Sequence, residues 1–263
     1  MDSLIDIGLN LADKRFSKDT QEVVERAVSS GVTHMILTGS SIKGSQKSLR
    51  LAKEFPNTLF STAGIHPHVA SEFNGQSIEQ LRGLANHQEV VAIGECGLDF
   101  NRMYSPQDIQ EDCFIAQLNL AREMDLPLFL HVRDAHQRFL EIMDNHQDLI
   151  NRSVVHCFTG SAEEVQQYVE LGFHIGITGW ICDERRGKEL QEAVKFIPLH
   201  RLMVETNAPY LTPRTLTPKP KNGRNEPAFL PHIVSEVAKY RGVSVEELAQ
   251  QATENTRRFF RLP

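Results

Sequence analysis

The chain alternates short apolar runs with longer polar segments over almost its whole length. Eight apolar runs stand out: residues 4–10 (LIDIGLN), 33–39 (THMILTG), 59–67 (LFSTAGIHP), 90–96 (VVAIGEC), 128–132 (LFLHV), 153–158 (SVVHCF), 173–179 (FHIGITG) and 202–206 (LMVET). Runs of this kind are typical of strands buried on both faces, as in a parallel sheet, and the polar segments between them are long enough for a helix. The pattern therefore predicts repeated strand–helix units.

Signals for helix N-termini lie between these runs. Serine with Gln or Glu three residues later is typical of a capping box, and serine before proline is typical of an N-cap and the first helical position. The sequence carries these signals at Ser77 with Gln80, Ser244 with Glu247, and Ser105 with Pro106. We expect the last helix over about residues 244–259.

Eight strand–helix units in about 250 residues fit the size and count of a (β/α)8 barrel, the TIM barrel. The alternative, a doubly wound sheet, usually carries a GxGxxG loop after its first strand, but residues 6–13 read DIGLNLAD. We therefore expect an α/β protein with a single (β/α)8 domain over residues 1–263.

Polar side chains follow several apolar runs, at the end where a (β/α)8 barrel carries its active site. Those expected there are Asn10, His66, His68, Glu95, His131, His156, Glu205 and Asn207. One histidine in such a place is usually a core residue held by hydrogen bonds. Glu95, His131 and His156, however, follow three successive runs and offer one carboxylate and two nitrogens, a set suited to a divalent cation.

A cation would also explain why a buried strand ends in a carboxylate. Burying Glu95 without a partner would be costly, and a metal ion held between it and the histidines would remove that cost. We expect the neighbouring glycines, Gly94 and Gly97, to let backbone and ligand approach closely.

Composition and charge exclude some classes of function. With 28 Lys and Arg against 34 Asp and Glu, the net charge of −6 gives no basic coat for gripping duplex DNA. No apolar run approaches the roughly 20 residues that cross a bilayer, and the N-terminus MDSLIDIG does not resemble a secretory signal. Cys96, Cys113, Cys157 and Cys182 form no CxxC pair, which argues against a disulfide scaffold or a structural zinc site. We expect a cytoplasmic protein with reduced thiols.

A basic, proline-rich loop follows the eighth run. Residues 214–227 (RTLTPKPKNGRNEP) carry Arg214, Lys219, Lys221 and Arg224. Basic side chains beside a metal site would suit a phosphorylated substrate, although a solvated surface loop would carry the same residues.

Seven motifs carry a family resemblance: GIHPH (64–68), IGECGLDF (93–100), FLHVRDA (129–135), HCFTG (156–160), GITGW (176–180), ETNAPYL (205–211) and RNEPA (224–228). They occur in the order and spacing found in TatD-type metal-dependent deoxyribonucleases, and the chain resembles this family from about residue 4 to 260. The resemblance implies an amidohydrolase-like barrel that hydrolyses phosphodiesters with Mg²⁺, or with Mn²⁺ or Zn²⁺. It also implies a 3′-to-5′ exonuclease for single-stranded DNA or RNA, with a role in DNA repair or degradation.

The matching motifs also imply roles for single residues. The residues that match metal ligands are Glu95, His131 and His156. His66 matches a residue of the active-site rim, Arg133 lies in the FLHVRDA motif, and Arg224 lies in a motif that borders the substrate groove. The resemblance thus implies that His66, Arg133 and Arg224 contact the substrate.

The chain departs from the family pattern at two places. Many relatives carry an H-x-H pair where this sequence has Gly8 and Asn10, so we expect one tightly held ion and a second that arrives with the substrate phosphate. The family usually has aspartate where this chain has Asn207, and an amide cannot take a proton from the attacking water. We expect Asn207 to bind metal and to slow turnover, with Glu205 as the reserve candidate for the catalytic base.

Two alternatives remain open at this point. The same barrel could hydrolyse an amide, a lactone or an aminoacyl ester, or it could bind nucleic acid without cutting it, as Asn207 would allow. The partner we expect is the 3′ end of single-stranded DNA or RNA. We expect no membrane and no obligate protein partner, and a monomer.

Overall fold

The computed structural model describes residues 3–263 as eight parallel strands, each paired with the next in the order of the chain. The strands are β1 (Leu4–Leu9), β2 (Val32–Leu37), β3 (Leu59–Ala63), β4 (Val90–Asp99), β5 (Leu128–Arg133), β6 (Ser153–Val155), β7 (His174–Ile177) and β8 (Leu202–Val204). Each coincides with one predicted run, so the (β/α)8 prediction is confirmed. The first two residues of the expected domain lie outside the described residues.

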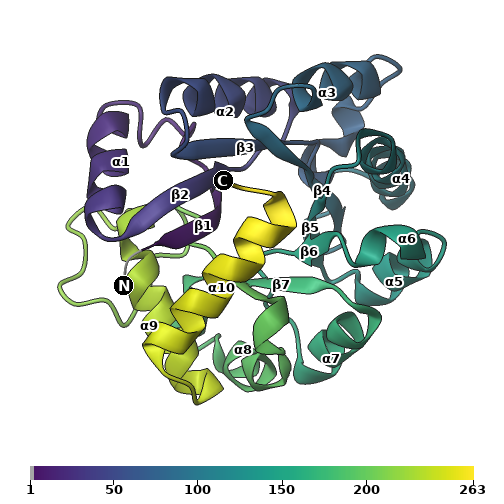
Figure 1. Cartoon of the computed structure of the whole chain (residues 1–263). Helices are drawn as coiled ribbons and strands as arrows, with labels where there is room; N and C mark the ends of the chain where they lie inside the picture. The colour runs from purple at the N-terminus through teal and green to yellow at the C-terminus, as the bar shows by residue number, and fades with distance from the viewer. Residues whose placement is uncertain (1–2) are drawn as a thin grey trace.

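Helices form an outer ring around the strands (Figure 1). The α-helices are α1 (Thr20–Ser29), α2 (Ile42–Glu54), α3 (Ser77–Ala85), α4 (Gln107–Met124), α5 (His136–Asp144), α6 (Gln147–Ile150), α7 (Ala162–Leu171), α8 (Lys188–Ala193), α9 (Leu230–Arg241) and α10 (Val245–Phe260). Short 3₁₀ helices are η1 (Pro67–Glu72), η2 (Gly179–Cys182), η3 (Val194–Phe196), η4 (Leu199–Arg201) and η5 (Pro227–Phe229). Between residues 3 and 263, no helix is both long enough and apolar enough to span a membrane.

Two of the predicted helix starts are wrong. Ser77 is the first residue of α3 and not its cap, because its Oγ accepts a hydrogen bond from the backbone N–H of Asn74, at 3.0 Å. Ser105 lies before the N-cap of α4, and its Oγ accepts from the N–H of Ser71, at 3.0 Å. The Ser77 hydroxyl therefore stabilises the loop before α3, and the Ser105 hydroxyl stabilises the 3₁₀ helix η1.

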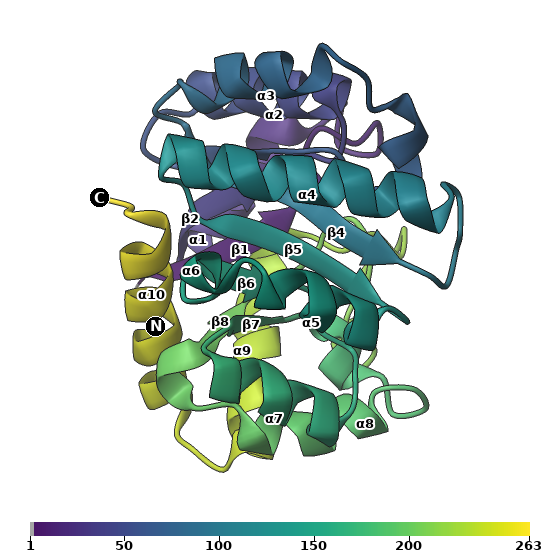
Figure 2. The ribbon, with the colours of Figure 1, turned by 90° about the vertical axis from the view of Figure 1, so that its right-hand side faces the viewer.

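The last helix closes the N-terminal end of the barrel. Ser244 caps α10 as predicted, because its Oγ accepts from the N–H of Glu247 at 3.1 Å. Figure 2 shows α10 across one end of the barrel, with β4 and β5 pointing away from it. Phe260 and Leu262 join the apolar cluster inside the barrel, which also contains Ile5, Ile7, Ile36, Phe60, Val91, Ala92, Phe129, Val154 and Met203. With this end plugged, polar side chains gather at the opposite end of the strands.

The seam between β1 and β8 is held by a buried carboxylate. The Asp6 Oδ1 atom accepts hydrogen bonds from the backbone N–H groups of Gly8, at 3.2 Å, and of Thr206, at 3.0 Å. The Thr206 hydroxyl donates to the other oxygen of Asp6. Just beyond, the N–H of Asn207 donates to the carbonyl of Gly8 at 2.8 Å. These bonds fix the backbone on which Glu205 and Asn207 lie.

Candidate metal centre

One oxygen of Glu95 faces three imidazole rings. Its Oε1 lies 2.7 Å from His156 Nε2, 3.2 Å from His131 Nδ1 and 3.2 Å from His66 Nε2. Glu95 is buried, at 8% exposure. One ligand atom from each of Glu95, His131 and His156 can be chosen so that all three lie within 4.8 Å of one another. The structure thus brings together the three residues from which the sequence predicted a cation site.

A bulge in β4 turns Glu95 inward. Gly94 pairs with Phe129 and Cys96 with Leu130, which leaves Glu95 as the extra residue between them. Gly94 has φ +139°, and a Cβ there would collide with the carbonyl oxygen of Phe129 on β5. The glycine therefore makes room for the neighbouring strand, and not for a ligand as we had expected.

The charges of this group are strongly coupled. Burial alone would raise the pKa of Glu95, but the neighbouring imidazole rings of His66, His156 and His131 hold it well below its usual range. Burial would lower the pKa of His156, but Glu205 and Glu95 outweigh it and raise the pKa to about 10. A buried, ionised carboxylate surrounded by ring nitrogens is a donor set that fits a divalent cation.

The two histidines of this set present opposite nitrogens to Glu95, and each has a carboxylate behind it. His156 turns Nδ1 to Glu205 Oε2, at 3.2 Å, while His131 turns Nε2 to Asp99 Oδ2, at 3.0 Å. Asp99 is not among the residues that the sequence predicts at the centre. Its signal was available, because Asp99 follows Glu95 by four residues in β4, on the same face by the two-residue period of a strand.

Glu205 is fully buried and does not face the Glu95 oxygen directly. Its Oε1 accepts the backbone N–H of Cys157 at 2.5 Å, and its Oε2 faces His156. A Cβ at Gly8 would collide with the same carboxylate. A side chain at Gly8, one of the two positions where the family resemblance places histidine, would therefore require the Glu205 carboxylate to shift.

Asn207 contacts Asn10, the second of the two positions where the family resemblance places histidine. Its Oδ1 accepts a hydrogen bond from Asn10 Nδ2 at 3.2 Å, and its own Nδ2 donates to Cys157 Sγ at 3.6 Å. Burial raises the pKa of the Cys157 thiol to about 12, so this thiol stays protonated. The two departures from the family pattern, Asn10 and Asn207, are therefore one contact in space.

The two arginines expected at the substrate differ in their surroundings. Arg133 ends β5, is exposed, and lines a cavity of about 360 Å³ next to Phe158. Arg224 is mostly buried and pairs with Asp19 at 2.6 Å and with Glu226 at 2.7 Å. These ion pairs fix the loop after β8 to the segment before α1, which explains Arg224 structurally and gives its expected contact with substrate no support.

The barrel and the set of one carboxylate and two histidines at the C-terminal ends of its strands are typical of a metal-dependent (β/α)8 hydrolase. The sequence matches the family described as TatD related DNase over residues 5–261, and the chain belongs to that family.

Close relatives align over nearly the full chain. The protein named 3'-5' ssDNA/RNA exonuclease TatD from Salmonella typhimurium is 51% identical over 257 residues, which cover 98% of each chain. The protein of the same name from Pantoea vagans is 51% identical over 259 residues, 98% of this chain and 100% of that one.

Solved structures agree with this family assignment. The TatD homologue YJJV of Escherichia coli superposes with a TM-score of 0.89 at 29% identity, covering 99% of this chain and 98% of that one. The TatD family hydrolase of Entamoeba histolytica gives 0.89 at 27% identity, covering 98% of both. The phosphotriesterase homology protein of Escherichia coli, at 15% identity and a TM-score of 0.69 over 98% of both chains, shares the fold alone.

Proposed function

We propose that the chain is a divalent-metal-dependent 3′-to-5′ exonuclease that hydrolyses phosphodiesters of single-stranded DNA or RNA. The observation that carries the proposal is the set of Glu95, His131 and His156, within a chain that is 51% identical to a relative named for this activity. Mg²⁺ is the ion we expect, with Mn²⁺ or Zn²⁺ as alternatives. Glu95, His131 and His156 would hold it, and the bound ion would supply a Lewis acid and lower the pKa of a water molecule.

His66 is suited to donate a hydrogen bond to the substrate. Its Nδ1 accepts the backbone N–H of His68 at 3.0 Å, so in the neutral ring the proton sits on Nε2, which points at the centre. Burial lowers the pKa of His66, which favours the neutral ring. The Nε2–H group can then bind a phosphate oxygen beside the metal ligands.

We infer a different role for Glu205 from the one its sequence position first indicated. It lies behind His156, and its two oxygens are taken by His156 and by the N–H of Cys157. It therefore orients the ring of His156 and is poorly placed to accept a proton from water at the centre.

Replacing Asn207 by aspartate tests whether the chain lacks a general base at this position. The substitution keeps the size of the side chain, and both of its contacts, Asn10 Nδ2–H and the protonated Cys157 thiol, can donate to a carboxylate. Because a general base contributes about 10²- to 10⁴-fold, we expect Asn207→Asp to raise the rate by at least about 100-fold.

The measurement is digestion of a 5′-labelled single-stranded oligonucleotide with Mg²⁺, Mn²⁺ or EDTA. We expect a ladder that shortens from the 3′ end with metal only. Asn86→Asp, which adds the same charge at an exposed position, should leave the rate unchanged. An equal rate for Asn207→Asp and the original chain would refute the argument about the base.

A second candidate function follows from Asn207 alone, namely a barrel that binds single-stranded nucleic acid without cutting it. Cleavage by the Asn207→Asp form only would favour this candidate. No cleavage by either protein, with metal bound, would instead favour an amide or ester hydrolase. The monomeric state, the cytoplasmic location and a role in DNA repair stay predictions.

A further inference from the structure

Asp99 lies at the end of β4, four residues after Glu95, and contacts two histidines at once. Its Oδ2 lies 3.0 Å from His131 Nε2 and 2.7 Å from His68 Nε2. We propose that Asp99 is a positioning residue that makes His131 present its Nδ1 lone pair to the metal centre. The proposal rests on the proposed metal centre, but its test reads metal binding and ring protonation, so it can fail while the exonuclease proposal stands.

The carboxylate of Asp99 is held in one orientation by its own turn. Its Oδ1 accepts the backbone N–H groups of Asn101, at 3.1 Å, and Arg102, at 2.8 Å. The backbone N–H of Asp99 donates in turn to Gln110 Oε1 at 2.8 Å. The residue is fully buried, so Oδ2 is left with the two histidine rings as its partners.

An ionised carboxylate only accepts hydrogen bonds, so it selects the protonated nitrogen of each ring. The Oδ1 atom of Asp99 already accepts two backbone N–H groups, and both ring nitrogens lie within hydrogen-bond distance of Oδ2, so Asp99 is the acceptor in both bonds. With its proton on Nε2, the neutral His131 ring has its lone pair on Nδ1, which lies 3.2 Å from Glu95 Oε1. A carboxylate behind a metal-binding histidine fixes ring orientation and raises the basicity of the ligand.

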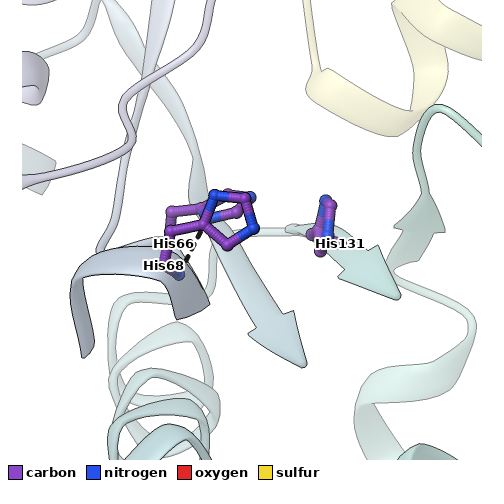
Figure 3. Close-up of side chains that lie close together, drawn as sticks. All are labelled: His66, His68 and His131. Atoms are coloured by element: carbon purple, nitrogen blue, oxygen red, sulfur yellow. Dashed lines mark hydrogen bonds between the residues drawn. The ribbon is translucent and has the colours of Figure 1, made fainter. Parts of the chain in front are cut away.

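The same geometry explains how His68 and His131, drawn with His66 in Figure 3, come together. His66 and His68 lie together after β3, with the bond from the His68 N–H to His66 Nδ1 drawn, and His131 lies on β5. The ring centroids of His68 and His131 are 6.0 Å apart. Since the Nε2 atoms of both His68 and His131 point to Asp99, this shared acceptor accounts for the close approach of their side chains.

Asp99→Asn tests the proposal with almost no change in shape. The amide oxygen is the only acceptor left, so the two backbone N–H groups of the turn hold it and the NH₂ group faces the rings. The NH₂ group donates to His131 Nε2, which moves the ring proton to Nδ1 and against the metal. We expect affinity for Mn²⁺, measured by calorimetry, to fall about 10- to 100-fold, while the melting temperature of the metal-free protein changes little.

Asp183→Asn is the matched control. Asp183 Oδ1 accepts the N–H groups of Arg185, at 3.0 Å, and Arg186, at 3.2 Å, in the same kind of turn. The Asp183 carboxylate forms ion pairs with the side chains of these arginines, where Asp99 contacts histidines. We expect its Mn²⁺ affinity to equal that of the original chain. An equal loss in both variants, or an Asp99→Asn affinity within about twofold of the original, would overturn the proposal.

A second measurement stands if Asp99→Asn does not fold. Heteronuclear NMR of the imidazole nitrogens in the original chain, loaded with diamagnetic Zn²⁺, reports which nitrogen of His131 carries a proton. We expect a protonated Nε2 and a metal-bound Nδ1. A protonated Nδ1, or binding of the metal through Nε2, would contradict the role assigned to Asp99.

Discussion

His156 and His131 approach Glu95 from neighbouring strands, but the protein surrounds them differently. The His156 side chain is 3% exposed, stacks on Phe129 at 4.2 Å between ring centroids, and has the fully buried Glu205 behind it. The His131 side chain is 18% exposed, and the Asp99 behind it also binds the half-exposed His68. We call these two sets the sealed arm (His156 with Glu205) and the open arm (His131 with Asp99 and His68).

One metal centre can therefore combine a rigid side with an accessible side. The sealed arm lies against the barrel core, so damage to it should cost folding free energy as well as metal affinity. The open arm reaches the rim, where His68 packs at 4.9 Å against Tyr104, a side chain 64% exposed. Damage to the open arm should therefore cost metal affinity with little loss of stability.

Glu95→Gln should have the largest effect, because both arms meet at this carboxylate. Loss of a ligand should exceed the roughly 100-fold upper range for a residue behind a ligand and should reduce Mn²⁺ binding and cleavage to background. Calorimetry and the oligonucleotide digestion measure both. Glu170→Gln, at an exposed position of α7, is the control. Normal Mn²⁺ affinity in Glu95→Gln would mean that the centre lies elsewhere.

Glu205→Gln should come next and should separate the two arms. The amide would keep one bond, to the N–H of Cys157, and turn its NH₂ group to His156 Nδ1, which moves the ring proton toward Glu95. We expect about a 100-fold loss of metal affinity together with about 1–3 kcal/mol of unfolding free energy. Urea unfolding in EDTA measures the second quantity. If Asp99→Asn costs more stability than Glu205→Gln, the distinction between a sealed and an open arm is wrong.

The sequence predicts the fold well because strands buried on both faces must be apolar throughout. It predicts boundaries less well. β4 continues to Asp99, although its apolar run stops at Cys96, because its last residues still pair with those of β5. The helix starts predicted at Ser77 and Ser105 are wrong because these hydroxyls accept the backbone N–H groups of Asn74 and Ser71. Such contacts depend on the folded structure and cannot be read from the local sequence.

The sequence also places Glu95, His131 and His156 near one another, because each follows a strand of one barrel. It does not tell which nitrogen of each ring faces the centre, since that depends on Asp99 and Glu205, far from the rings along the chain. The ion pair of Arg224 with Asp19 could not be predicted either, because the two residues lie about two hundred positions apart in the sequence.

The last prediction concerns the seam on which the sealed arm rests, and its effect on metal binding should be the smallest. Burial raises the pKa of Asp6 to about 7, from 3.8 for an unperturbed aspartate. Between these values the folded state holds the proton more tightly than the unfolded state. The stability linked to Asp6 is therefore complete below the unfolded pKa, falls as pH rises toward 7, and is lost above it.

Asp6→Asn should remove this dependence. Its Oδ1 can still accept the N–H groups of Gly8 and Thr206. Its amide can donate to Thr206 Oγ once the hydroxyl, which donates to Asp6 in the structure, turns away. We expect the unfolding free energy of Asp6→Asn, relative to the original chain, to rise by about 2–3 kcal/mol from pH 5 to pH 8 in EDTA. Asp112→Asn, at an exposed position of α4, should show no such rise. Parallel pH profiles for Asp6→Asn and the original chain would mean that the seam carries an ionised carboxylate, and the sealed arm would then rest on charge and not on a shared proton.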